Sequence, residues 1–170
     1  MVVKILASTG ATVGTYTVNS AVYAVAFDGA NIWTANRNSN TVTKLLASTG
    51  AAVGTYNVGN LPIALAFDGA NMWVANNAGS LTELAASTGE VLGTFSIPGS
   101  PGDLSGIAFD GTNLWVTTGN NESVVKVLAS TGAIAGTYPV SGSPFGIAFD
   151  GDNIWTANYD GNTVTRLLVR

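Results

Sequence analysis

The chain has 170 residues, a net charge of −4 and a sequence pI of about 4.4. This acidic balance argues against nucleic acid and anionic membranes as partners, because both attract clustered Lys and Arg. The sequence contains neither His nor Cys, which removes disulfides, thiolate nucleophiles and the commonest general base. No apolar run approaches the roughly 18–20 residues of a membrane span, and MVVKILASTG lacks the layout of a signal peptide.

A fourfold repeat organises the whole chain. Residues 7–46, 47–85, 86–128 and 129–168 repeat one pattern at lengths of 40, 39, 43 and 40 residues. A period near 40 with short strand-like runs between turns is typical of a β-propeller, in which each repeat forms one sheet, called a blade. We therefore predict one all-β propeller domain over residues 1–170, with four blade-equivalents of four antiparallel strands and essentially no helix.

The chain is expected to begin with two strands from the outer half of a blade. Residues 1–6 (MVVKIL) copy a third strand, and residues 11–18 copy a fourth, outermost strand. Residues 21–27 (AVYAVAF) then start a new blade, because a run that is apolar on both faces and rich in small residues suits an innermost strand. We name the strands of a blade A, B, C and D, from the inside outward.

Turn residues and alternation predict the other strands of that blade. An Asp-Gly pair between two apolar runs is a strong hairpin signal, so residues 31–36 (NIWTAN) are predicted as strand B. Residues 37–40 (RNSN) form a polar connection. Residues 41–46 (TVTKLL) alternate polar and apolar as a half-buried strand C does, and residues 52–58 (AVGTYNV) form strand D.

Two columns of residues recur at fixed places in the repeats. One Trp per repeat lies on strand B, and we predict that all four are mostly buried between neighbouring blades. Basic residues recur on strand C, where we expect solvated side chains. The tryptophans are Trp33, Trp73, Trp115 and Trp155, and the basic residues are Lys4, Lys44, Lys126 and Arg166, with Glu83 as the exception.

The two ends of the chain together hold one strand too many for a closing blade. Residues 144–149, 153–158 and 163–168 supply strands A, B and C, while residues 1–6 duplicate strand C. One copy must be displaced, add as a fifth strand or pair elsewhere. Because roughly 4–8 blades are typical, we expect a homodimer forming an eight-bladed ring, with a four-bladed monomer or a longer natural or engineered array as alternatives.

The stretches IWTANRNSNTVTKLLASTG and GIAFDGDNIWTANYDGNTVTRLL resemble the YVTN and NHL repeat families and, most closely, the streptogramin (virginiamycin B) lyase-like propellers. The resemblance covers essentially the whole chain and implies a propeller fold in a bacterial or archaeal protein, often extracytoplasmic. Streptogramin lyases are metal-dependent enzymes whose site uses histidines. This chain has none, so no catalytic residue of the family maps onto it.

The B-to-C loops and D-to-A links of such blades open on one face, which we name the loop face. The repeats differ most there, and the one insertion, residues 98–105 (PGSPGDLS), lies in a D-to-A link. A polar small molecule or a peptide could bind around the channel mouth; the alternative is that these are solvated loop residues. The candidate ligand-binding residues are Arg37, Asn38, Asp103, Asn120, Asn121, Glu122, Tyr159 and Asp160.

Catalytic and metal sites are not expected. Asp150-Gly151-Asp152 and Asp160-Gly161 lack the spacing of a calcium loop and are predicted to be turns, so we expect no metal or cofactor. No nucleophile elbow, phosphate-binding loop or carboxylate pair is visible. The sequence favours a non-enzymatic scaffold or a binding module. The alternative is a degenerate metal-assisted lyase or hydrolase of the streptogramin-lyase type that uses carboxylates and Tyr.

Overall fold

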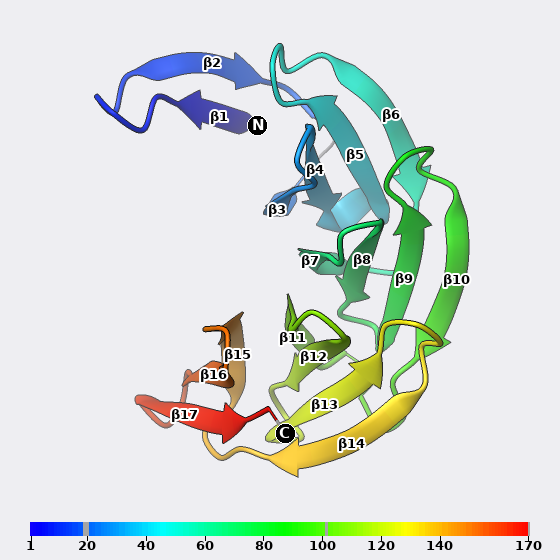
Figure 1. The fold of residues 1–170 in the computed structure, drawn as a ribbon, viewed down its shortest axis with the longest axis vertical. Helices are drawn as coiled ribbons and strands as arrows, with labels where there is room; N and C mark the ends of the chain where they lie inside the picture. The colour runs from blue at the N-terminus through cyan, green and yellow to red at the C-terminus, as the bar shows by residue number, and fades with distance from the viewer. Residues whose placement is uncertain (19–20, 101, 170) are drawn as a thin grey trace.

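The computed structural model describes residues 1–18, 21–100 and 102–169, and nearly all regular structure in them is β-strand. Five antiparallel sheets follow one another along an open arc, with β1 near one end and β17 near the other (Figure 1). One helical turn, η1 (Arg37–Ser39), interrupts the strands. No helix within the described ranges is long and apolar enough to span a membrane.

Three of the sheets are complete four-stranded blades, as the repeats predict. Each is a meander whose strand A lies on the concave side of the arc and whose strand D lies on the convex side (Figure 1). Blade 1 contains β3 (Val22–Phe27), β4 (Asn31–Asn36), β5 (Thr41–Leu46) and β6 (Ala52–Asn57). Blade 2 contains β7 (Pro62–Phe67), β8 (Asn71–Asn76), β9 (Ser80–Ala85) and β10 (Val91–Ser96). Blade 3 contains β11 (Leu104–Phe109), β12 (Asn113–Thr118), β13 (Ser123–Leu128) and β14 (Ile134–Pro139).

The two remaining sheets are partial blades at the ends of the arc. β1 (Val2–Ile5) and β2 (Thr12–Tyr16) pair only with each other and correspond to strands C and D. β15 (Pro144–Phe149), β16 (Asn153–Asn158) and β17 (Thr163–Leu168) form a three-stranded sheet that corresponds to strands A, B and C. The fold is thus three blades and two partial ones. The expected closing blade from both termini is not formed, because the ends lie in separate sheets.

The strand register determines which side chains of a blade face the next blade. Trp33 lies opposite Lys44, and Ala35 lies opposite Val42, so these side chains share the face that looks toward blade 2. There Trp33 and Val42 form one hydrophobic cluster with Met72, Val74 and Leu84 of the next blade, among others. Similar clusters join blades 2 and 3, and blade 3 and the β15–β17 sheet. The core is therefore divided into slabs between successive blades.

The prediction that all four tryptophans are mostly buried between neighbouring blades is correct for three and wrong for Trp155, which has a blade on one side alone within the described residues. Trp33, Trp73 and Trp115 are at most 1% exposed, whereas Trp155 is 37% exposed. The difference has a simple cause: each of the first three packs in a cluster with the following sheet, whereas the β15–β17 sheet that holds Trp155 is the last sheet of the arc (Figure 1). The same side chain in the same local strand therefore changes its burial with its position in the array.

The prediction of solvated basic side chains on strand C holds for Lys4 and Arg166, which are exposed, and is wrong for Lys44. Lys44 is only 5% exposed; its ammonium donates to the carbonyl of Ala86 at 2.6 Å and lies 5.3 Å from the centre of the Trp33 ring. Lys4 makes the equivalent hydrogen bond one blade earlier, donating to the carbonyl of Ala47 at 2.9 Å. These residues tie strand C of one blade to the C-to-D turn of the next.

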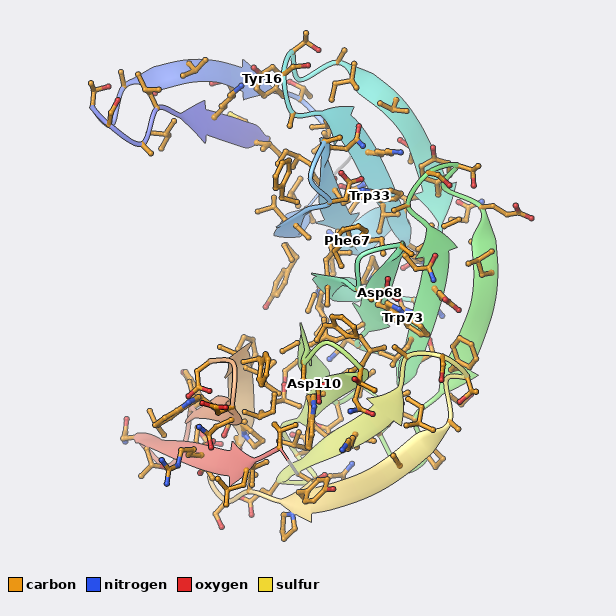
Figure 2. All side chains as sticks on the ribbon, in the orientation of Figure 1. Tyr16, Trp33, Phe67, Asp68, Trp73 and Asp110 are labelled. Atoms are coloured by element: carbon orange, nitrogen blue, oxygen red, sulfur yellow. The ribbon has the colours of Figure 1, made fainter. Side chains whose placement is uncertain are left out.

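An aromatic ring on strand D makes a second tie between blades. Tyr16 lies where the β1–β2 sheet meets blade 1 (Figure 2), and a Cβ on Gly50 would overlap its ring. Tyr56 covers Gly89 and Phe95 covers Gly132 in the same way. Gly50 also has a φ of +76°, so both the turn conformation and the aromatic cover require glycine there.

Candidate functional site

The loop face carries a cavity of about 300 Å³ formed by three blades and the β15–β17 sheet. Its lining comes from the starts of strands A, the B-to-C loops and the D-to-A links. Five of the eight predicted site residues line it. They are Arg37, Asp103, Asn120, Tyr159 and Asp160. We name this cavity the loop-face pocket.

One position in every repeat lines the loop-face pocket directly after strand B. These four aligned residues have little chemistry in common, although the strands before them are closely similar: NIWTAN, NMWVAN, NLWVTT and NIWTAN. The four are Arg37, Asn77, Gly119 and Tyr159.

A second aligned position lies near the start of strand A, and its residues are not among the predicted site residues. Its four residues also line the pocket and also differ in chemistry, whereas the Phe that ends strand A is the same in every repeat. Their signal in the sequence is a change of chemical type at one strand position between repeats of the same pattern. They are Tyr23, Ile63, Ser105 and Phe145.

Arg37 supplies the positive charge of the pocket. The η1 turn positions it, with its backbone N–H donating to the carbonyl of Ala21 at 2.9 Å. Its guanidinium lies 5.8 Å from the centre of the Tyr23 ring, within range of a cation–π interaction. Within the described ranges, the guanidinium makes no hydrogen bond or ion pair, so its donors remain available to an anionic group.

Asp103 is buried, and its carboxylate is already occupied. It accepts hydrogen bonds from the backbone N–H groups of Asn120 and, at 3.0 Å, of Asn121. These bonds tie the long D-to-A link to the neighbouring B-to-C loop. The role of Asp103 is therefore to shape the wall of the pocket. Within that link, Pro101 lies outside the described residues.

Asp160, the other acidic residue of the pocket, also joins two loops. The Asp160 carboxylate accepts a hydrogen bond from the Ser143 hydroxyl, which joins the last B-to-C loop to the last D-to-A link. Next to it, Tyr159 is 78% exposed and presents its ring at the pocket. The tyrosine is thus available for contact, while the aspartate holds the backbone around it.

The three other predicted residues lie outside the loop-face pocket. Asn38 is exposed on the η1 turn. Asn121 and Glu122 line a neighbouring cavity, where the Asn121 amide donates to the carbonyl of Gly99 at 2.5 Å. Glu122 accepts from the backbone N–H of Gly142 at 3.0 Å. These contacts give Asn121 and Glu122 a structural role in the loops.

Asp150-Gly151-Asp152, which the sequence predicts to be a turn and not a calcium loop, forms the hairpin turn between β15 and β16. Asp150 accepts from the backbone N–H groups of Asp152 and Asn153 and from the indole Nε1 of Trp155. These bonds hold the carboxylate ionised and lower its pKa. In residues 1–18, 21–100 and 102–169, no group of three or more His, Cys, Asp or Glu is placed to hold a metal ion.

Comparison with solved structures identifies the architecture. The chain is similar to the computationally designed Ika4 protein, with a TM-score of 0.78, 16% identity and coverage of 91% of this chain and 94% of that one. It is also similar to hydrazine synthase of Kuenenia stuttgartiensis, with a TM-score of 0.71, 19% identity and coverage of 84% and 43%. The WD40 repeats of RRP9 match with a TM-score of 0.70, 14% identity and coverage of 89% and 52%.

These similarities are all below 25% identity, so they show the fold alone, and function must be inferred from the site. The neighbours are β-propellers, and the chain spans about half the length of hydrazine synthase and of the RRP9 chain. No protein-family model and no curated protein sequence matches the chain. The chain is therefore an all-β protein of the propeller class.

Proposed function

We propose that the chain is a non-enzymatic binding module and that its ligand occupies the loop-face pocket. The observation that carries the proposal is the coincidence of the two chemically variable columns with one cavity. Repeats that share one strand and turn pattern differ in chemistry at these two aligned positions, and the eight residues concerned line one cavity. Variation concentrated on one concave surface, carried by a uniform scaffold, is the usual arrangement of a binding site on a repeat protein.

The chemistry of the pocket favours a ligand with a carboxylate and an apolar part. Arg37 is its cation, and its two acidic residues already accept hydrogen bonds from neighbouring loops. Tyr23 and Phe145 offer ring surface beside it. We therefore propose a short peptide or a polar small molecule bearing a carboxylate, with the carboxylate at Arg37.

The alternative of a lyase or hydrolase of the streptogramin-lyase type gains no support from the site. A carboxylate that acts as a base needs a free oxygen near the substrate, and the lining carboxylates of Asp103 and Asp160 are used to fix loops. We propose that the chain is related to that family in fold and that it does not catalyse a reaction.

The ligand proposal is tested with a panel of acetylated tripeptides that carry either a free C-terminal carboxylate or a C-terminal amide. Calorimetry should detect binding of carboxylate forms with an apolar side chain and much weaker binding of the matched amides. Arg37→Gln should weaken binding by on the order of 10-fold or more, whereas Arg166→Gln, the same charge change on β17, should not. Equal binding of acids and amides, or indifference to Arg37→Gln, would contradict the proposal.

We propose further that the protein partner of the chain is a second copy of itself, in an eight-bladed ring. Large apolar side chains are exposed at both ends of the arc, including Val25 and Phe27 at one end and Phe145 and Val164 at the other. Such surfaces favour association in water. Light scattering tests this, since a 17.2 kDa monomer at micromolar concentration would contradict it.

A further inference from the structure

An apolar cavity of about 240 Å³ lies between the β1–β2 sheet and blade 1. It is separate from the loop-face pocket and nearly all its walls are hydrocarbon. Among its lining residues are Val2 and Tyr16 from the β1–β2 sheet and Val25, Ile32 and Leu45 from blade 1. We name it the end socket.

The end socket has the same walls as the site that Trp33 fills one blade later. Trp33 is buried in a cluster with Val42, Met72 and Leu84, and with Tyr56 and Leu65 packed against it. One repeat earlier, the aligned residues of those five line the end socket. Val2 corresponds to Val42, Ile32 to Met72, Leu45 to Leu84, Tyr16 to Tyr56, and Val25 to Leu65. Among the buried residues of that cluster, the tryptophan is the one with no counterpart one repeat earlier, because β1 and β2 supply strands C and D but neither strand A nor strand B. Ala26, the strand A residue packed against the cluster, has no counterpart there for the same reason.

The missing strand B is present at the other end of the arc, with its tryptophan uncovered. Trp155 on β16 is 37% exposed, whereas its equivalents are covered by a strand D aromatic ring of the same blade. Those ring pairs are Trp33–Tyr56, Trp73–Phe95 and Trp115–Tyr138, with centroids 5.4–5.8 Å apart. Trp155 lacks a strand D, and Tyr16 on β2 lacks a tryptophan.

We propose that the end socket receives the indole of Trp155 from a second copy of this chain, with β16 of that copy pairing beside β1. The composite blade is then β15 and β16 of one copy with β1 and β2 of the other. The inference rests on the proposed self-association and names the contact that forms it. Because the interface is head-to-tail, two copies related by a two-fold axis form it twice and close a ring of eight blades.

The β1–β2 sheet already sits on blade 1 as a finished blade would. Lys4 donates to the carbonyls of Ala47 and Ser48 at 2.9 and 3.4 Å, and Lys44 donates to those of Ala86 and Ser87 at 2.6 and 3.3 Å. The outer half of the composite blade is thus prearranged. When β16 pairs with β1 of the other copy, β17 must leave its place beside β16, because both β1 and β17 are copies of strand C. The strand β16 thus exchanges one antiparallel neighbour, β17, for another, β1.

The C-to-D turn of the β1–β2 sheet supplies an independent observation. The turn glycines of the three complete blades lie under a ring from the preceding blade, but nothing described lies within 4 Å of a Cβ built on Gly10. In the ring, the preceding blade is blade 3 of the other copy, whose strand D carries Tyr138. The same contact then recurs at the composite blade.

Cysteine crosslinking tests the pairing, since the chain has no Cys of its own. Thr34 lies opposite Thr43 in blade 1, so Thr156 of one copy should lie opposite Val3 of the other. The double variant Val3→Cys/Thr156→Cys should form a disulfide-linked dimer on mild oxidation. Each single variant should not. The intrachain pair Thr34→Cys/Thr43→Cys shows whether this register accepts a disulfide.

A second pair tests which copy of strand C stays in the blade. If β17 kept its place and paired with β2, Thr165 would lie opposite Thr15, as Thr43 lies opposite Thr55. Crosslinking of Thr15→Cys/Thr165→Cys without crosslinking of the first pair would overturn the assignment of the end socket to Trp155 beside β1.

Removing the indole tests the socket itself. Trp155→Ala should raise the dimer dissociation constant by on the order of 30-fold or more, as loss of a central aromatic anchor does. Leu92→Ala, at an exposed apolar position on β10, should leave it unchanged. A dimer that tolerates Trp155→Ala would overturn the socket but keep self-association. A monomeric wild-type chain would overturn both, and the tripeptide experiment on Arg37 would still judge the ligand proposal separately.

Discussion

The indole Nε1 of Trp115 donates a hydrogen bond to the carboxylate of Asp110 at 2.7 Å, across the hairpin turn between β11 and β12. The same carboxylate accepts from the backbone N–H groups of Thr112 at 2.8 Å and Asn113 at 2.6 Å. Trp73 and Asp68 form the equivalent pair in blade 2, where Figure 2 shows them close together. The Asp-Gly turn therefore does more than reverse the chain, because it also fixes the buried Trp.

This pair makes stability depend on acid pH. Burial raises the pKa of Asp110, but the hydrogen bonds from Trp115, Asn113 and Thr112 outweigh it, so the net pKa lies below the ordinary 3.8. A lowered pKa in the folded state stabilises the fold above pH 3.8, and that contribution is lost as the pH falls through the lower value. Asp28 has a lowered pKa for the same reasons. Urea unfolding should show a falling free energy of unfolding below about pH 4.

Asp110→Asn should reduce the free energy of unfolding at pH 7 by about 1–3 kcal/mol, because hydrogen bonds to a charged acceptor are weakened. It should also flatten the pH dependence of the free energy of unfolding below pH 4. An unchanged acid limb in this variant would show that other carboxylates cause it.

The tryptophan column should show two different costs of truncation. Trp73→Ala should lower the free energy of unfolding by about 3–5 kcal/mol, because it leaves a cavity in a closed cluster. Trp155→Ala should cost clearly less when unfolding is measured at a concentration low enough to keep the chain monomeric, since its ring is only partly covered. Equal costs would mean that Trp155 is buried in the monomer.

Glu83 is a repairable exception in the basic column. Desolvation and the nearby charge of Asp68 raise its pKa, so an ionised Glu83 lowers the stability of the fold relative to the unfolded chain. Glu83→Lys should raise the free energy of unfolding by about 1 kcal/mol, since the ammonium can reach the next C-to-D turn as that of Lys44 does.

Glu83→Gln is the control for that variant, because it removes the charge without supplying an ammonium. It should recover only part of the gain. Asn71 donates to Glu83 at 2.7 Å and should turn to Asp68 in the Lys variant, as Asn31 donates to Asp28. A loss of stability in Glu83→Lys would show that the Asn71 contact matters more than the column.

A buried amide in blade 2 offers a further test. Within the described residues, Asn76 Oδ1 is buried and has no hydrogen-bond partner. In blade 1, the equivalent Asn36 Oδ1 accepts from the hydroxyl of Thr34 at 3.0 Å, but Val74 occupies that position in blade 2. Val74→Thr should therefore stabilise by about 1 kcal/mol in thermal or urea unfolding. Val74→Ala, which removes volume without a hydroxyl, should destabilise.

Shortening the chain at either end should have opposite effects on association. Removal of residues 163–170 deletes β17, so the proposed dimer should form at least as tightly, because nothing must be displaced. Removal of residues 1–6 deletes β1 and part of the end socket, and should abolish the dimer. Sedimentation of both shortened chains measures this, and the reverse result would show that β17 provides strand C.

The strands were predictable because their signals are local and repeated. The alternation of TVTKLL gave the bounds of β5 correctly, and Asp-Gly located the turn before β4. The burial of Trp155 was not predictable from its own strand, because the strand B segment NIWTAN around it is the same as the one around Trp33. What differs is the presence of a following blade to cover the ring, and Trp155 gains such a blade only if the arc closes into a ring.

The site was partly predictable for a similar reason. Arg37 and Tyr159 stand out in loops, where change is easy to notice. Tyr23 and Phe145 lie within strands of apolar residues, where a change of type resembles ordinary core variation. Only the placement of the start of strand A beside the B-to-C loops shows that they line the pocket.

The aromatic ring over each turn glycine has a consequence for how such proteins change in length. Since Tyr16 meets Gly50 and Tyr56 meets Gly89 in the same way, this contact between blades does not depend on which two repeats meet. Excising or duplicating one unit of about 40 residues should therefore recreate this ring-over-glycine contact at the new junction. The number of blades in the ring is thereby left to gene duplication and chain assembly, and can vary while the blade itself stays the same.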